Sequence, residues 1–270
     1  MPLPTLPDPP VVALLTDMGL DDWYVGTMKG VVLAAAPSAR LVDVCHSLPK
    51  QSIQDAAFIL GLSHAYFPVG TVFLCVVDPG VGSRREAMVA RNERFYFVAP
   101  NNGLLSFVAD RSGEWEGRVI ENPAYLLPER SQTFHGRDVF APAAGHLAAG
   151  APFDTFGPPL AETYRLPFVE NVVLREKGVT GRIIYIDSYG NLLTNLTPEM
   201  LAGCPDLSRV KLQFKQHIVQ GIAPHYSAVP LYHPLMYWGS SGFLEIAINR
   251  GSAERKWSGT VGEWFELEWP

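Results

Sequence analysis

The stretch TVFLCVVDPGVGSRR, residues 71–85, decides how the fold is interpreted. Its first seven residues are apolar or β-branched, which is typical of a strand buried on both faces. The strand ends at Asp78, and a tight turn with two glycines and two arginines follows. In α/β folds, sites are built where strands end. We therefore interpret Asp78 and Arg85 as candidate site residues, and the alternative is a polar turn with a surface ion pair.

Buried strands and helices alternate on both sides of this stretch. Strands are predicted at residues 11–17, 39–46, 71–77 and 95–100, and helices at 23–37, 52–67 and 138–150. Ser52, with Asp55 three residues later, gives one helix a capping-box start. Strands that alternate with helices form βαβ units. The sequence thus predicts an α/β domain over residues 1–165, with a mostly parallel sheet flanked by helices.

The pattern changes after the proline-rich residues 156–170. Short strands with turns between them are predicted at residues 181–187, 191–196, 210–214, 243–248 and 262–268. No long helical period occurs among them. Many short strands of this kind are typical of a small β-sandwich or barrel. We therefore predict a second, smaller all-β domain over residues 166–270.

Composition limits the classes of function. The chain has 270 residues, of which 47% are hydrophobic, and a net charge of −6. Nucleic-acid binding needs a basic stripe, so we expect no nucleic-acid partner. Residues 58–77 carry no formal charge and have transmembrane length, but Pro68 and Gly70 would break a spanning helix. The first residues lack the pattern of a signal peptide. We expect a cytoplasmic protein without a membrane span.

The three cysteines, Cys45, Cys75 and Cys204, are far apart and form no CxxC pattern. The sequence therefore suggests neither a zinc site nor a disulfide framework, which fits a reducing cytosol. It also contains no HExxH or comparable pair of metal ligands. We expect that the protein requires neither a metal nor a cofactor.

Other polar clusters also follow predicted strands. TDMGLDD places Asp17 and Asp22 after the first strand. A carboxylate there could accept ribose hydroxyls, and the alternative is an acidic helix N-terminus. DSYGNLLTN places Asp187 and Asn191 around a glycine. An asparagine offers both a donor and an acceptor, as an adenine edge requires, and the alternative is a plain hairpin turn.

A third cluster, FHGRD, places His135 before a predicted helix. A lone histidine is more often structural than catalytic. Asp78, Arg85 and His135 together, however, would form a carboxylate–guanidinium–imidazole set for a small polar reactant.

Five motifs occur in the order and at about the spacing of one family: LLTDMGLDDWYVGTMKG, VVDPGVGSRR, FVAPNNGLLS, FHGRDVFAPAAGHLAAG and YIDSYGNLLTN. From about Val11 onward the chain resembles the S-adenosyl-L-methionine hydroxide adenosyltransferases, relatives of the adenosyl fluoride and chloride synthases. The resemblance implies hydrolysis of S-adenosyl-L-methionine to adenosine and L-methionine, by water or hydroxide attacking the ribose 5′ carbon. It also implies a homotrimer, with substrate between the N-terminal domain of one subunit and the C-terminal domain of its neighbour.

The resemblance further assigns roles to residues. Asp78, Arg85 and His135 match the set that positions the water or hydroxide. The residues that match substrate-binding positions are Asp17 for the ribose, Asp22 and Asp187 for the methionine ammonium, and Asn191 and Asn249 for the adenine. On this interpretation His135 could take the proton of the water near neutral pH, and Arg85 could stabilise the developing hydroxide without a metal.

Two features separate the hydrolytic relatives from the halide-using ones. The fluoride-forming enzymes carry tyrosine where this chain has Asp78, and they have an insertion that is absent between Arg85 and Phe95. A carboxylate would repel a halide ion but can accept a hydrogen bond from water. Ser241 stands where those enzymes use an arginine for the methionine carboxylate. Two alternatives remain: a halide-dependent adenosyl transferase, and a non-catalytic module that binds adenosine or S-adenosylmethionine.

Overall fold

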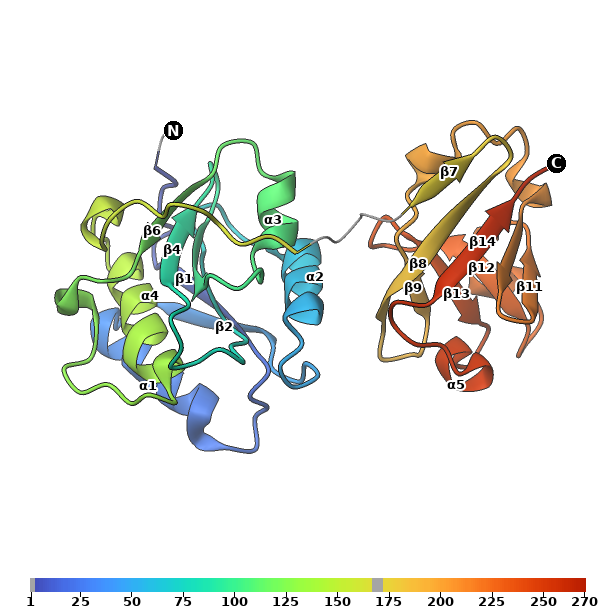
Figure 1. The fold of residues 1–270 in the computed structure, drawn as a ribbon. Helices are drawn as coiled ribbons and strands as arrows, with labels where there is room; N and C mark the ends of the chain where they lie inside the picture. The colour runs from blue at the N-terminus through green and yellow to red at the C-terminus, as the bar shows by residue number, and fades with distance from the viewer. Residues whose placement is uncertain (1–2, 167–171) are drawn as a thin grey trace. The chain divides into compact units, whose positions relative to one another are not determined.

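The computed structural model describes residues 3–166 and 172–270 of the chain. Two compact units are present, Met1–Leu166 and Pro167–Pro270, and each has its own hydrophobic core. The first contains a six-stranded sheet with helices, and the second contains an eight-stranded sheet (Figure 1). Among the described residues, no helix is long and apolar enough to cross a membrane.

The first unit alternates between strand and helix along most of its length. In chain order its elements are β1 (Val11–Thr16), α1 (Trp23–Ala35), β2 (Arg40–Cys45), α2 (Ile53–Ser63), β3 (Val72–Val76), β4 (Ala87–Arg91), β5 (Tyr96–Pro100), α3 (Ser106–Arg111), β6 (Glu116–Val119), a π-helical turn (Gly136–Phe140) and α4 (Ala141–Ala148). The predicted cap of α2 is formed, because the Asp55 N–H donates to Ser52 Oγ at 3.3 Å. All the strands and helices predicted for this unit are present, whereas β4, β6 and α3 were not predicted.

The sheet of the first unit has the strand order β2–β1–β3–β5–β4–β6. The pairings among β2, β1, β3 and β5 are parallel, and the two pairings of β4 are antiparallel. The prediction of parallel strands is therefore right for four strands, but the sheet as a whole is mixed. The reason is that β4 and β5 form a hairpin, closed by the Asn92 N–H donating to the Phe95 carbonyl at 3.1 Å.

The central strands of this sheet are buried on both faces. Val12 and Leu14 of β1 belong to the core with α1 and α4, and Ala13 and Leu15 to the core with α2 and α3. Figure 1 shows the same pairs of helices, α1 with α4 and α2 with α3. Cys75 of β3 is fully buried as well, and burial raises the pKa of its thiol. The continuous apolar runs in the sequence are thus explained by helices on both faces of the sheet.

The second unit consists mainly of antiparallel strands. Its elements are β7 (Val173–Arg175), β8 (Gly178–Ile186), β9 (Leu192–Thr194), β10 (Lys211–Phe214), β11 (His217–Gln220), β12 (Pro234–Trp238), β13 (Leu244–Ile248), α5 (Ala253–Trp257) and β14 (Trp264–Glu268). The strand order is β11–β10–β14–β8–β9–β13–β12, with β7 paired to β8. A bridge between Ile222 and Met236 brings the chain after β11 beside β12, so the sheet nearly closes into a barrel. The predicted all-β unit is confirmed in this coarse form.

Candidate functional site

The carboxyl ends of the parallel strands form one polar edge of the first unit. Asp17 directly follows β1, and Asp78 follows β3 after a single residue. Asn102, which follows β5, donates from Nδ2 to the Val77 carbonyl at 2.9 Å and so fixes the chain at the end of β3. Parallel strands place their carboxyl ends together, which explains why residues distant in sequence meet at this edge.

Asp78, Arg85 and His135 are in direct contact at this edge. Arg85 Nε donates to Asp78 Oδ1 at 3.0 Å and to Asp78 Oδ2 at 2.9 Å, and Arg85 Nη2 lies 2.8 Å from His135 Nδ1. Only 5% of the Asp78 side chain and 11% of the Arg85 side chain are exposed. The Arg85 guanidinium also lies over the Phe140 ring, 5.1 Å from its centroid. The structure therefore brings these three side chains together in a partly desolvated position.

The contact with Arg85 determines the tautomer of His135. A guanidinium only donates hydrogen bonds, so His135 Nδ1 accepts one and the ring proton lies on Nε2. Burial, and then the positive charge of Arg85, lowers the pKa of His135. Both effects favour the neutral ring. His135 thus presents an Nε2–H donor, and its basic nitrogen is already occupied.

His135 is held by the start of the helix that follows it. The π-helical turn Gly136–Phe140 comes directly after His135 and continues into α4. Asp138 in this turn is fully buried and accepts hydrogen bonds from Arg137 Nε at 2.5 Å and from the Ser131 N–H at 2.7 Å. Single π-helical turns are frequent at functional sites. Asp138 therefore ties the segment before His135 to the helix after it.

The two other aspartates of this unit differ in their surroundings. Asp17 Oδ2 accepts the Gln51 N–H at 2.7 Å, and no other hydrogen bond to this carboxylate occurs within residues 3–166 and 172–270. Asp22 is exposed at the N-terminus of α1, and its side chain makes no capping hydrogen bond there. Both carboxylates therefore retain acceptor positions for a ligand.

The second unit places Asp187 and Asn191 on one tight turn between β8 and β9. Asp187 Oδ1 accepts the N–H groups of Tyr189 and Asn191 at 2.9 and 2.8 Å, and Asp187 Oδ2 accepts Asn191 Nδ2 at 2.8 Å. Gly190 has a φ of +80°, and a Cβ atom there would lie 2.0 Å from Ser252 Oγ. Only glycine suits both conditions. The alternative of a hairpin turn is thus correct for the backbone, but the turn also lines a pocket.

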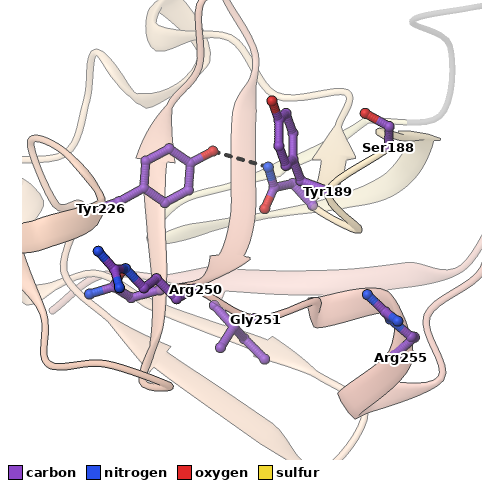
Figure 2. A pocket seen from close by; sticks show the side chains of 9 residues that line it. Ser188, Tyr189, Tyr226, Arg250, Gly251 and Arg255 are labelled. Carbon is purple, nitrogen blue, oxygen red and sulfur yellow. Dashed lines mark hydrogen bonds between the residues drawn. The ribbon is translucent and has the colours of Figure 1, made fainter.

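This pocket has a volume of about 720 Å³, within the range of small-molecule sites (Figure 2). Its lining residues are Ser188, Tyr189, Asn191, Tyr226, Ile248, Asn249, Arg250, Gly251 and Arg255. We call it the barrel pocket. Asn249 Nδ2 donates to the Val229 carbonyl at 2.8 Å, which leaves the Asn249 side-chain oxygen for other partners. The two tyrosines and the two arginines were not predicted.

Apart from Asp22, the predicted residues thus fall into two groups, one in each unit. We call Asp17, Asp78, Arg85 and His135 the strand-end cluster. Asn191 and Asn249 lie in the barrel pocket, and Asp187 holds one of them. In the parts of the chain that the structure describes, no group of three or more His, Cys, Asp or Glu side chains is arranged to hold a metal ion.

The α/β unit with its carboxylate–guanidinium–imidazole set, together with the β unit and its amide-lined pocket, defines a protein that handles a small polar molecule. The family model for the SAM hydroxide adenosyltransferase N-terminal domain matches residues 12–157, and that for the C-terminal domain matches residues 181–266. The chain belongs to the SAM hydroxide adenosyltransferase family, as the sequence motifs indicated.

Individual relatives agree with this assignment. The chain is 38% identical to the (R)-S-adenosyl-L-methionine hydrolase of Thermus thermophilus, over 90% of this chain and 93% of the relative. It is 34% identical to the enzyme of the same name from Salinispora arenicola, covering 94% and 96%, and 26% identical to a fluorinase of Nocardia brasiliensis, covering 90% and 91%. The crystal structure of an uncharacterized conserved protein from Thermotoga maritima superposes with a TM-score of 0.88 at 35% identity, covering 95% of this chain and 99% of that one.

Proposed function

We propose that this protein hydrolyses S-adenosyl-L-methionine to adenosine and L-methionine. Family membership supports the substrate, and the relatives called hydrolases are more similar to this chain than the fluorinase is. The observation that carries hydrolysis, as opposed to halide transfer, is the Asp78 carboxylate in contact with Arg85. A fixed negative charge repels a halide ion but accepts a hydrogen bond from water.

In this proposal Asp78, Arg85 and His135 hold a water in line with the ribose 5′ carbon. The water oxygen forms the new bond to that carbon, and the electron pair of the carbon–sulfur bond passes to the sulfonium, which leaves as neutral methionine thioether. Departure therefore needs no general acid. Positioning of this kind contributes up to roughly 7–11 kcal/mol in ideal cases.

The geometry changes the role that we expected for His135. Its Nδ1 accepts from Arg85, so the ring is suited to donate from Nε2 to the water oxygen and not to take the water proton. Asp78 is the remaining acceptor, because a carboxylate has about four lone-pair positions and the three hydrogen bonds from Arg85 do not fill them all. We assign proton removal to Asp78, and stabilisation of the developing negative charge to Arg85 and His135.

We assign substrate binding as the resemblance implies. The residues concerned are Asp17 for the ribose hydroxyls, Asp22 and Asp187 for the ammonium group, and Asn191 and Asn249 for the adenine. The free acceptor positions of Asp17 and Asp22 support their part in this assignment. A homotrimer, a cytoplasmic location and the lack of a cofactor also belong to the proposal and rest on the sequence and the resemblance.

The proposal is tested by incubating the protein with S-adenosylmethionine, with and without chloride, and separating the products by chromatography. Adenosine and methionine should form in equal amounts and independently of chloride. A 5′-chloro-adenosine product that requires chloride would overturn hydrolysis in favour of halide transfer. Binding without any product would instead identify a non-catalytic module.

A further inference from the structure

A buried carboxylate, that of Glu245, is connected through hydrogen bonds to the lining of the barrel pocket. Glu245 of β13 is only 6% exposed. It accepts hydrogen bonds from Ser241 Oγ at 3.2 Å and from the Tyr237 hydroxyl, and no ion pair to it occurs in the described part of the chain. A Cβ atom at Gly239 would lie 1.8 Å from Glu245 Oε1, so the backbone closes tightly over this group. Such a group is costly to bury unless its hydrogen bonds are fully used.

A chain of hydrogen bonds connects Glu245 to the wall of the barrel pocket. The Tyr237 hydroxyl bonds to the Tyr226 hydroxyl, and Tyr226 Oη accepts Asn191 Nδ2 at 3.0 Å, the dashed line in Figure 2. Asn191 Nδ2 also donates to Asp187 Oδ2 at 2.8 Å. The two tyrosine rings pack together with centroids 4.7 Å apart. The chain therefore runs from one carboxylate to another through two hydroxyls and one amide.

Only one direction of the hydrogen bonds is consistent along this chain. The side-chain nitrogen of Asn191 is a donor, and both of its protons are used, one by Asp187 and one by Tyr226. The Tyr226 hydroxyl must therefore donate its hydrogen bond to the Tyr237 oxygen, and the Tyr237 hydroxyl donates to Glu245. If the Asn191 amide turned over, its oxygen would face the Asp187 carboxylate, acceptor against acceptor. The orientation of the amide is thus determined chemically.

We propose that Glu245, acting through Tyr237 and Tyr226 and together with the Asp187 carboxylate, fixes Asn191 as a hydrogen-bond acceptor toward the barrel pocket and so selects a base with an exocyclic amine over one with an exocyclic carbonyl. The proposal rests on the proposed function in taking a nucleoside as the ligand of this pocket. Within the described residues Asn191 Oδ1 has no hydrogen-bond partner, which leaves it for a ligand. A carbonyl placed against this oxygen leaves two acceptors facing each other, which is disfavoured.

The test compares the affinities of adenosine and inosine, which carry an amine and a carbonyl at the same ring position, by calorimetry. Glu245→Gln keeps the shape of the side chain but introduces a hydrogen-bond donor, which can reverse the direction of the hydrogen bonds from Tyr237 to Tyr226. We expect the preference for adenosine to fall by roughly tenfold, the size of one hydrogen bond to a ligand. Tyr226→Phe, at a side chain that is 40% exposed, should shift the preference in the same direction if Glu245→Gln does not fold.

Tyr232→Phe is the matched control, because Tyr232 is exposed in the same unit and outside the barrel pocket. It should leave the preference unchanged. Equal weakening of both nucleosides in folded Tyr226→Phe would indicate a merely structural role and overturn the inference. An unchanged preference in a variant that still hydrolyses S-adenosylmethionine overturns this inference alone. If the unaltered protein bound neither nucleoside, the inference and the assignment of the pocket would both fail.

Discussion

The two units surround a carboxylate in opposite ways. In the first, Asp78 is paired directly with the Arg85 guanidinium and lies at the carboxyl ends of the parallel strands. In the second, Glu245 is paired with hydroxyl groups only, among the described residues, and lies behind the barrel pocket. A guanidinium next to a carboxylate can stabilise the negative charge that develops on a reacting atom. A chain of hydroxyls carries no net charge and fixes only the direction of hydrogen bonds. The first arrangement suits catalysis and the second suits recognition.

The largest effect that tests this comparison is expected at Asp78. Asp78→Asn keeps the volume of the side chain but removes the acceptor for the water proton. Turnover should fall by about 10²–10⁴-fold, the usual contribution of a general base, while binding of S-adenosylmethionine changes little. Product chromatography and calorimetry measure the two quantities separately.

Arg84→Ala provides the control for this prediction, since Arg84 is an exposed arginine on the same turn. Its removal should leave turnover unchanged. If Arg84→Ala were as damaging as Arg85→Ala, the catalytic role would belong to the other guanidinium. If Asp78→Asn weakened the binding of S-adenosylmethionine as much as it lowered turnover, the comparison would not hold, because Asp78 of the first unit would then serve recognition as well as catalysis.

A smaller effect is expected at Asp17. Asp17→Asn retains an oxygen for the Gln51 N–H but removes the charge that we assign to the ribose hydroxyls. A hydrogen bond to a charged group contributes about 1.5–3 kcal/mol, so the affinity for adenosine should fall by roughly 10–100-fold. Calorimetry with adenosine measures this directly. An unchanged affinity would rule out the ribose role and leave nucleoside binding to the barrel pocket alone.

The smallest effect concerns pH and His135. Burial and the charge of Arg85 lower the pKa of His135, so the folded protein favours the neutral ring. The contribution of the neutral His135 ring to the free energy of unfolding is therefore fully present above the ordinary histidine pKa of about 6.5. It is lost as the pH falls through and below that value. A protonated ring would also set N–H against N–H at Arg85. Turnover should decline on the acid side, and this decline should be absent from the pH profile of His135→Asn. A profile that is the same in both proteins would contradict the assignment.

The strand-end cluster could be predicted because each of its members has a local signal. Asp78 and Arg85 belong to a glycine turn at the end of an apolar run, and His135 precedes a helix. The parallel pairing of β1 and β3 then places Asp17 and Asp78 at the same edge. Residues of this kind can be found from sequence, because the elements that carry them are recognisable one at a time.

The hydrogen-bonded chain behind the barrel pocket has no such signal. Tyr237 and Glu245 meet because they are direct partners in the antiparallel pairing of β12 with β13, and β12 was not predicted. Tyr226 comes from a short turn between strands. A single glutamate in a strand is ordinarily taken to face solvent, and nothing in its neighbours shows that this one is buried. The strand β4 was missed for a related reason, since its last residue, Arg91, is a charged side chain buried by pairing with Glu116.

The burial of Cys75 has a practical consequence for following the motions of the protein. Thiol reagents attack the thiolate, and a buried thiol with a raised pKa does not react while β3 stays closed. Cys45 and Cys204 are partly exposed, so replacing both by serine would leave Cys75 as the only thiol of the chain. The rate at which Cys75 is alkylated would then measure how often β3, the strand that leads to Asp78, opens.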